Sequence, residues 1–293
     1  ISIPTQLKKI CEKAFGKCIS LTSVEIPDNS ELQSIGRKAF YKTEIKCFTI
    51  PSKLVELGEN WFTDTVKLKQ INIMPNNPNF TLYDDKFVLG KSNPQNENFD
   101  VLIFANRDLK TALVPNFIRI IGNYSFGLCE KLENVEFSDD SELRIICENA
   151  FSLSEIKSIT IPPKLIELKD GWKYRAESLK SVYISAKNTN FKMHDDKFIL
   201  GKSNPENEIF DILVYSKNDV KTAVIPEFIR IISAGAFIDC WSLDSVTFKE
   251  KCQLESIKKF AFSNTKIKEI SIPSSVKEIG KRAFLNCNNL TVV

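Results

Sequence analysis

The chain has 293 residues, with 40 basic and 37 acidic side chains and a formal net charge of +3. This near balance gives no support for nucleic-acid binding, which normally needs a basic face or stripe. No stretch reaches the roughly 18 consecutive apolar residues of a membrane-spanning helix, so we expect no membrane contact within this sequence. Phenylalanine occurs 21 times against a single histidine, and such a skew is typical of repeated sequences.

A short unit of about 22 to 25 residues recurs from the start of the chain, a length within the range of leucine-rich repeats. Each unit holds an isoleucine, an Ala-Phe pair, further apolar positions and a closing Ile-Pro. The first copy consists of Ile10, Ala14-Phe15, Cys18, Leu21, Val24 and Ile26-Pro27. Later copies include Ile35, Ala39-Phe40 and Ile50-Pro51, then Ile146, Ala150-Phe151 and Ile161-Pro162, and Ile257, Ala261-Phe262 and Ile272-Pro273.

A longer period lies on top of this unit. Phe15, Phe126 and Phe237 are 111 residues apart (126 − 15 and 237 − 126). Tandem duplication explains this spacing, so residues 1–293 form a single solenoid of about 2.6 copies of a 111-residue block (293/111). Both chain ends carry pieces of a motif that is whole elsewhere, and we therefore expect a fragment of a longer parent protein.

Each block contains one stretch that breaks the short period. These stretches, residues 74–108 and 185–219, hold apolar runs separated by Asp, Gly, Asn and Pro. Alternating runs with such turn residues are typical of β-hairpins. We therefore predict two strand-rich hairpin inserts that stay in line with the solenoid.

Local patterns predict the shape of one unit. Leu21-Thr22-Ser23-Val24-Glu25-Ile26 ends with the alternation of a strand, and Pro27 closes it because proline cannot donate to a ladder. The spacing in Ile35-Gly36-Arg37-Lys38-Ala39-Phe40 predicts one short turn of helix packed inward. Where Trp172-Lys173 replaces Trp61-Phe62, the tryptophan is expected to take over the core position. The predicted fold is an α/β repeat solenoid: a right-handed leucine-rich repeat superhelix, strand-rich with short helical turns, with a ladder of phenylalanines in its core.

The motif Ile-Pro, Ile, Ala-Phe, Cys, Leu, Val, Ile-Pro resembles the BspA-like leucine-rich repeat family over nearly the whole chain. The Asn-, Lys- and Ile-rich composition is similar to family members from parasitic protists such as trichomonads. The inserts depart from the family pattern, because Lys86 and Lys197 follow Asp85 and Asp196 where the family has Gly. The resemblance implies a cell-surface or secreted protein that adheres to host cells, matrix proteins or other microbes.

Groups that suggest chemistry have simpler structural interpretations. The only histidine, His194, stands where the first block has Tyr83, so a catalytic role is not expected. The pairs Asp84-Asp85 and Asp195-Asp196 fit tight turns better than a metal site, with weak calcium binding as the alternative. Gly90-Lys91-Ser92 and Gly201-Lys202-Ser203 lack the earlier glycine of a phosphate-binding loop. We predict a non-enzymatic protein without a cofactor or a metal ion.

The eight cysteines contain no CxxC pair. Cys18, Cys129, Cys240 and Cys287 share one repeat position and are expected to be buried structural thiols. The other four are Cys11, Cys47, Cys147 and Cys252, and a bridge among neighbours is left open for them. Three glycosylation acceptors, Asn79, Asn123 and Asn289, give mild support for a secreted protein.

A candidate binding face follows from the strand pattern. Positions between the inward-facing residues of stacked strands point to solvent, and these are Glu25, Thr49, Asn72, Glu136, Thr160, Tyr183, Thr247 and Ser271. Sites just upstream add Lys46, Lys69, Lys157, Lys180 and Lys268 against Glu133 and Asp244. Trp241 stands where other copies have Ile, Glu or Asn, so it is a candidate interface anchor.

These observations predict a protein-binding or adhesion module of a cell-surface or secreted protein. The expected ligand is a protein of a host cell or matrix, with a glycan as the second choice. The alternative is an intracellular scaffold for protein–protein interaction, which unpaired cysteines would suit.

Overall fold

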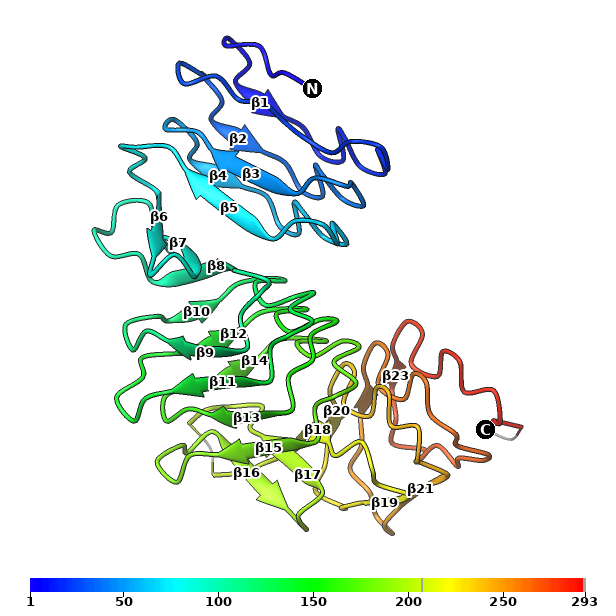
Figure 1. Ribbon diagram of the computed structural model, residues 1–293. Coiled ribbons are helices and arrows are strands. Elements are labelled where there is room, and N and C mark those ends of the chain that lie inside the picture. Colours follow the sequence, from blue (N-terminus) through cyan, green and yellow to red (C-terminus); the bar gives the residue numbers. More distant parts are fainter. Residues whose placement is uncertain (207, 292–293) are drawn as a thin grey trace.

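The computed structural model describes residues 1–206 and 208–291, which wind into coils stacked one on another (Figure 1). Each complete coil has a short strand, a set of turns and a long strand. The long strands are β3 (Cys47–Ile50), β5 (Gln70–Ile73), β9 (Thr111–Val114), β11 (Asn134–Phe137), β13 (Ser158–Ile161), β15 (Ser181–Ile184), β19 (Thr222–Ile225) and β21 (Ser245–Phe248). Neighbouring long strands pair in parallel, as β9, β11, β13 and β15 do.

The short strands form a second parallel column. They are β1 (Lys9–Ile10), β2 (Ser34–Ile35), β4 (Glu56–Leu57), β10 (Ile120–Ile121), β12 (Ile145–Ile146), β14 (Glu167–Leu168), β20 (Ile231–Ile232), β22 (Ser256–Ile257) and β23 (Glu278–Ile279). Their isoleucines stack in register, for example Ile121 on Ile146. The predicted leucine-rich type of solenoid is therefore formed by two strand columns.

The Ala-Phe segments form the third side of each coil, called the turn side below, and here the prediction of short helical turns is wrong. No helix forms within residues 1–206 and 208–291, so none could span a bilayer. The residues two before and two after each core position have positive φ, as in Lys13 (56°) and Lys17 (66°) around Phe15. A helix needs φ near −60°, so it cannot continue through them. The fold class is consequently all-β and not α/β.

The backbone N–H groups of the turn side form hydrogen bonds with carbonyls of the neighbouring coil. The N–H group of Phe15 donates to the carbonyl of Ala39, and that of Phe126 donates to Ala150, both at 2.8 Å. Lys13 and Lys17 make the same kind of bond to Arg37 and Tyr41. These donors are therefore committed to the next coil instead of to a helix.

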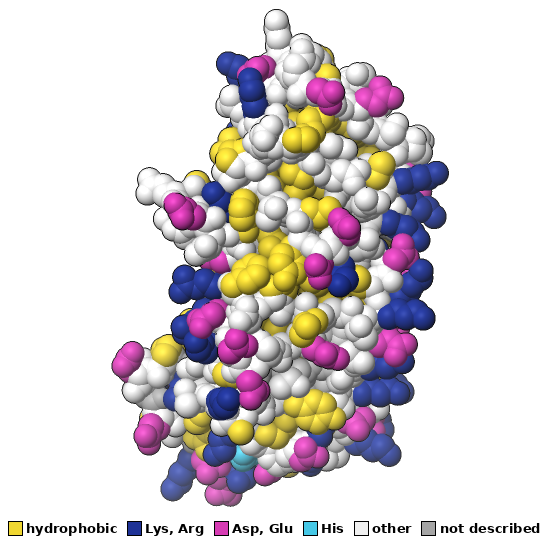
Figure 2. Space-filling model, turned by 60° about the vertical axis from the view of Figure 1, so that its left-hand side comes forward, with side chains coloured by type: hydrophobic (Ala, Val, Ile, Leu, Met, Phe, Trp, Pro, Cys, Tyr) yellow, Lys and Arg dark blue, Asp and Glu magenta, His cyan; other side chains and the backbone are white. Residues whose placement is uncertain are grey.

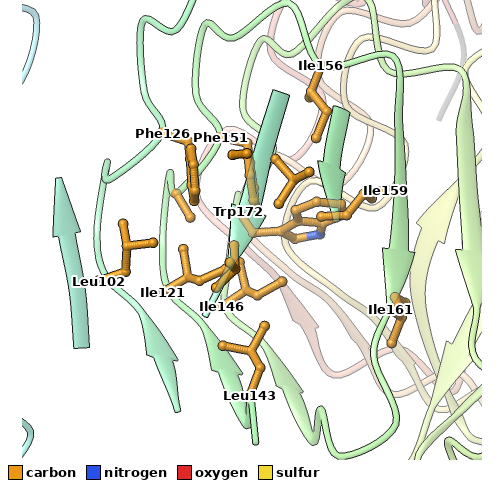
Figure 3. Packing of buried hydrophobic residues seen from close by; sticks show 14 of the residues in the cluster. Leu102, Ile121, Phe126, Leu143, Ile146, Phe151, Ile156, Ile159, Ile161 and Trp172 are labelled. Atoms are coloured by element: carbon orange, nitrogen blue, oxygen red, sulfur yellow. The ribbon is translucent and has the colours of Figure 1, made fainter. Parts of the chain in front are cut away.

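The predicted phenylalanine ladder is present within each run of coils. Phe126 and Phe151 stack with centroids 5.1 Å apart, and Phe262 and Phe284 with centroids 5.3 Å apart. Figure 3 shows Phe126 beside Phe151, with Trp172 next to them. These side chains, apart from Phe284, are buried, so each ring covers the apolar face that its neighbour could not bury alone.

Two antiparallel hairpins interrupt the coils. The first contains β6 (Phe80–Tyr83) and β7 (Phe87–Gly90), and the second β16 (Phe191–His194) and β17 (Phe198–Gly201). β7 and β17 continue into β8 (Val101–Ala105) and β18 (Ile212–Ser216), which pair in parallel with β10 and β20. β7 and β17 are buried on both faces, because Val88 faces one core and Phe87 and Leu89 face the next.

The hairpins divide the solenoid into a first stack (residues 1–74), a middle stack (99–185) and a last stack (211–291). The coil after each hairpin is short on its turn side. In this coil, nine residues lead from Leu102 in the short-strand column to Thr111 in the long-strand column (111 − 102). In the next coil, Leu102 pairs with Ile121 and Thr111 pairs with Asn134, and thirteen residues separate these two partners (134 − 121). Because this coil has fewer residues on its turn side, the coils before and after it lie closer together there, and the stack bends toward the turn side. Figure 1 shows the result, with the last stack lying beside the middle stack rather than below it.

The ladder predicts a graded cost of truncation. Phe126→Ala should lower the free energy of unfolding by about 3–5 kcal/mol, because it opens a cavity at a fully buried ring. Phe15→Ala should cost clearly less, since Phe15 in the first coil is only half-buried. Urea unfolding monitored by circular dichroism measures both. Equal losses for the two variants would contradict stacking as the source of stability.

Candidate functional site

The outward positions of the long strands form rows, called the outer rows below. Backbone pairing aligns Thr49 with Asn72, Thr160 with Tyr183 and Glu136 with Leu113. Most of the side chains are exposed, Tyr183 by 58%. The last stack aligns Val224 with Thr247, and Ser271 is exposed on the next coil. Glu25 belongs to a bridge with Ser2 in the first stack.

A second set of side chains lies one residue before each long strand and is called the lysine row below. The backbone N–H group of Lys69 donates to the carbonyl of Lys46 at 3.1 Å, and that of Lys180 donates to the carbonyl of Lys157 at 3.0 Å. Lys268 donates to Asp244 in the last stack. In one view of the surface, Figure 2 shows basic side chains, with acidic ones between them, along one long edge.

Acidic neighbours neutralise part of the lysine row. Lys157 lies 2.8 Å from the carboxylate of Glu133, and this hydrogen bond lowers the pKa of Glu133. Lys69 and Lys131 both contact Asp108, at 3.4 and 2.7 Å, which lowers the pKa of that carboxyl. All these groups are exposed, so such pairs contribute little to stability.

Sequence reasoning missed four members of these rows. Leu113 and Val224 belong to the outer rows and are 65% and 52% exposed. Lys110 and Lys221 belong to the lysine row, since Glu133 and Asp244 donate to their carbonyls. All four lie in the short coils after the inserts, where the Ala-Phe part of the repeat is absent. The Val-Pro and Ile-Pro endings at 114–115 and 225–226 were the available signal.

The structure does not bring all predicted site residues together. Tyr183, Thr160 and Lys180 share the middle stack, whereas Trp241 lies in the last stack. Trp241 is 48% exposed at the corner between the turns and β21. The candidate face is therefore three separate segments, one for each stack.

The three glycosylation acceptors differ in accessibility. Asn289 is exposed. The side chain of Asn79 already donates to the carbonyl of Leu54 at 3.3 Å. Asn123 is half-buried, and the serine of its motif, Ser125, is fully buried. Asn289 is therefore the best presented of the three.

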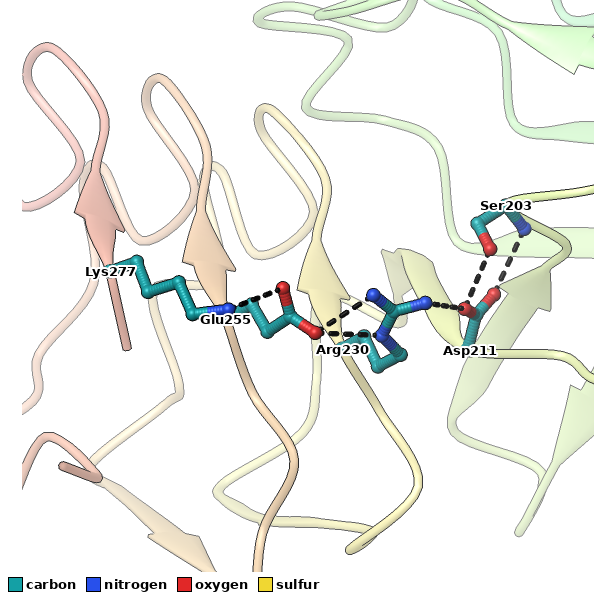
Figure 4. A network of polar contacts seen from close by, with 5 residues as sticks. All are labelled: Ser203, Asp211, Arg230, Glu255 and Lys277. Atoms are coloured by element: carbon teal, nitrogen blue, oxygen red, sulfur yellow. Dashed lines mark hydrogen bonds and ion pairs between the residues drawn. The ribbon is translucent and has the colours of Figure 1, made fainter. Parts of the chain in front are cut away.

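The motifs that resemble catalytic or phosphate-binding elements have structural roles. Ser203 donates its N–H and hydroxyl to Asp211 at 2.9 and 2.7 Å. Arg230 pairs with both Asp211 and Glu255, and Glu255 also pairs with Lys277 (Figure 4). The first block repeats the serine–aspartate contact with Ser92 and Asp100. The Asp pairs occupy hairpin turns with φ near +50° at both residues, as in type I′ turns. His194 packs its ring edge-on to Phe228.

All eight cysteines carry free thiols. Cys129, Cys240 and Cys287 are buried as predicted, and burial raises the pKa of Cys240 to about 11. Cys18 is exposed, contrary to expectation, because it lies in the first coil and only one side of that coil is covered by a complete neighbour. Cys11 and Cys47 are exposed as well.

Lys173 is the most unusual buried group. Contrary to expectation, Trp172 keeps the place of Trp61 and Lys173 itself enters the core, only 3% exposed. Its amine donates to the carbonyl of Ile238 at 3.4 Å and lies 5.0 Å from the ring centre of Tyr215. Burial lowers the pKa of Lys173.

Comparison with known proteins agrees with this architecture. The family described as BspA type leucine rich repeat region matches in six copies over residues 1–87, 97–195 and 207–293. The chain belongs to this family. Leucine-rich repeat solenoids of this kind are typically non-enzymatic modules for protein interaction.

One solved structure shows the same fold, and two others are reported with it. A leucine-rich repeat protein from Eubacterium ventriosum superposes with a TM-score of 0.61 at 17% identity, covering 97% of this chain and 75% of that one. A leucine rich cell surface protein from Faecalibacterium prausnitzii gives 0.49 at 21% identity, covering 99% and 86%. The pneumococcal vaccine antigen PcpA gives 0.48 at 18% identity, covering 100% and 61%. No curated protein matches the chain in sequence.

The cysteine environments predict two classes of thiol. Cys11, Cys18 and Cys47 should react with a chromogenic disulfide reagent at pH 8 at least about a hundredfold faster than Cys129, Cys240 and Cys287, which need local opening to react. The absorbance trace gives both phases. Replacing the three exposed cysteines by serine should abolish the fast phase, and Cys129→Ser should leave it intact. A fast phase that survives the triple replacement would refute this assignment.

The buried amine predicts a pH-dependent stability. Because the pKa of Lys173 is lowered, the unfolded chain binds more protons than the folded one between that pKa and the ordinary value of 10.5. This group therefore makes stability rise with pH across that window and lowers stability as pH falls through it. Lys173→Met should flatten the rise measured by urea unfolding as the pH is raised toward the ordinary lysine value of 10.5, and should stabilise most at the acidic end.

Lys180→Met is the matched control, since Lys180 is exposed. It should leave the slope with pH unchanged. If Lys173→Met and Lys180→Met gave the same pH profile, the buried amine would not be the titrating group.

Proposed function

We propose that the chain is a protein-binding module that adheres through its outer rows and lysine row, within a cell-surface or secreted parent protein. The observation that carries this proposal is a set of large apolar side chains exposed on the outward side of the long strands in the middle and last stacks. Leu113, Tyr183 and Val224 all project from long strands. Exposed aromatic and aliphatic groups beside charged ones are typical of protein interfaces.

The arrangement suits an extended ligand. Outward side chains repeat at the strand spacing of about 4.8 Å within each stack, and lysines run parallel to them. Lys180 forms no ion pair with the described residues, so its charge is available to a partner. A host-cell or matrix protein is the ligand we favour, with a glycan as the second choice. Membership of the BspA-type family supports the surface location.

The alternative is an intracellular scaffold that uses the same rows. It is favoured by one observation, the eight free thiols, three of them exposed, since exposed thiols suit a reducing compartment. Surface labelling of intact cells that produce the parent protein separates the two. Labelling supports adhesion, and protection until lysis supports the scaffold.

The binding face is tested with Tyr183→Ala combined with Lys180→Glu, two changes on one coil. Binding of the purified protein to whole host cells and to immobilised matrix proteins should be saturable. The double variant should weaken it by about tenfold or more, because it removes an aromatic anchor and reverses a neighbouring charge.

Lys9→Glu is the control, because it reverses an exposed lysine on the short-strand side. It should bind like the parent chain. An equal loss in both variants, or no binding by protein shown to be folded, would move the interaction to another surface or make the chain a spacer.

A further inference from the structure

The turn sides of all three stacks meet around one pocket. Its volume is about 610 Å³, and it is lined by Lys42 from the first stack, Tyr174 from the middle stack and Phe260 and Arg282 from the last. These residues are up to 240 positions apart (282 − 42). The pocket exists because the solenoid bends toward its turn side at each hairpin.

The bend is tight enough to bring backbone into contact. Gly171 of the middle stack and Gly235 of the last stack both have positive φ, and a Cβ on Gly235 would lie 3.9 Å from the Cα of Gly171. Tyr124 makes the corresponding contact at the first bend, where its hydroxyl donates to Asp64 at 3.2 Å. The pocket walls are thus held by packing and not by a loose loop.

Cations dominate two of the walls. Lys38 and Lys42 come from the first stack, and Lys259 and Arg282 from the last. None of the four forms an ion pair within the part of the chain that the structure describes. Three carboxylates also line the pocket: Glu148 and Asp170 belong to the middle stack, and Asp64, which accepts the hydroxyl of Tyr124, belongs to the first. A negatively charged ligand is therefore attracted to the two outer walls and repelled from the floor between them.

The aromatic rings favour a particular kind of anion. Lys38 and Lys42 lie 5.5 and 5.4 Å from the ring centre of Tyr41, and Lys259 and Arg282 lie 5.2 and 5.9 Å from that of Phe260. The ring faces of Tyr41 and Phe260 are thus used by cations, and the ring of Tyr174 packs against Phe260 with centroids 6.1 Å apart. This arrangement leaves little aromatic surface for a sugar ring to stack on. Carboxylates on a flexible chain can reach both walls without stacking.

We infer that this pocket binds an acidic peptide segment of a partner protein, with its carboxylates between the cations of the first and last stacks. The site is separate from the outer rows and does not depend on them. It would give the module a second, electrostatic contact on the inside of the bend.

The test uses a fluorescein-labelled octaglutamate peptide and fluorescence anisotropy at low salt. Lys42→Asn combined with Arg282→Asn removes one cation from each wall. Both residues have positive φ (56° and 60°), and the repeat itself places Asn60, Asn149, Asn264 and Asn286 at equivalent turn positions, so asparagine adds no backbone strain. The dissociation constant should rise about tenfold.

The matched control is Lys13→Asn combined with Lys251→Asn. Both lysines are exposed, have positive φ and lie outside the pocket lining, so octaglutamate binding should stay within about twofold. Tyr183→Ala with Lys180→Glu should also leave it unchanged, which separates this site from the proposed adhesive face.

Three results would overturn the inference. The folded protein could fail to bind octaglutamate, or the control and pocket variants could lose binding equally, which would indicate general charge attraction. A heparin-derived hexasaccharide could also bind and depend on Lys42 and Arg282 while octaglutamate does not. In that case the ligand would be a sulfated glycan.

Discussion

Coil-to-coil hydrogen bonding on the turn side is the constraint on which the rest of the structure depends. At each complete step, alternate backbone N–H groups of one coil donate to carbonyls of the next, as Phe237 does to Ala261 at 2.8 Å. This pattern fixes the distance between coils and places the rings of Phe237 and Phe262 face to face at 4.9 Å. It also forces residues on either side of each ring into the left-handed region. The phenylalanine ladder and the absence of helix within the described residues therefore have a common cause.

A buried cation donates to a backbone carbonyl of the turn side at each of the two bends. The short coil after each hairpin has fewer turn residues, so it has fewer backbone N–H groups that can donate to the carbonyls of the next coil. At the first bend, Arg107 donates to the carbonyl of Ser125 at 2.9 Å and stacks 4.3 Å from Phe104. At the second bend, Lys173 donates to Ile238 beside Tyr215, the residue 111 positions after Phe104. The two cations differ in what they supply. The carbonyl of Ile238 has no backbone donor among the described residues, and Lys173 satisfies it, which matters because an unpaired buried carbonyl is costly. The carbonyl of Ser125 already accepts the N–H group of Ala105 at 2.9 Å, so Arg107 adds a second hydrogen bond there.

Much of the fold could be read from the sequence because the repeat makes one local pattern many times. The strand ending at Ile50-Pro51, the ring of Phe40 and the hairpin around Asp84-Asp85 all follow from alternation, burial and turn chemistry. The turn geometry did not follow, because Lys13 and Lys17 are not residues that signal a left-handed backbone. The burial of Lys173 could not be predicted either, since it depends on a carbonyl 65 residues away. Leu113 was not predicted, because the outward strand positions were assigned from units with an Ala-Phe pair, and the short coil lacks that pair.

The two surfaces differ in what they require of the fold. Each outer row is a property of a single stack, set by strand register, and so is largely independent of the bends. The pocket on the turn side needs Lys42, Tyr174 and Arg282 to converge, and only the bends at both hairpins bring them together. The divergence between blocks is informative here: Tyr124 of one block becomes Gly235 of the next, which lets the last stack approach the middle one closely. Duplication alone would give equal bends, so differences at the junctions, rather than in the repeats, set the curvature that shapes the inner surface.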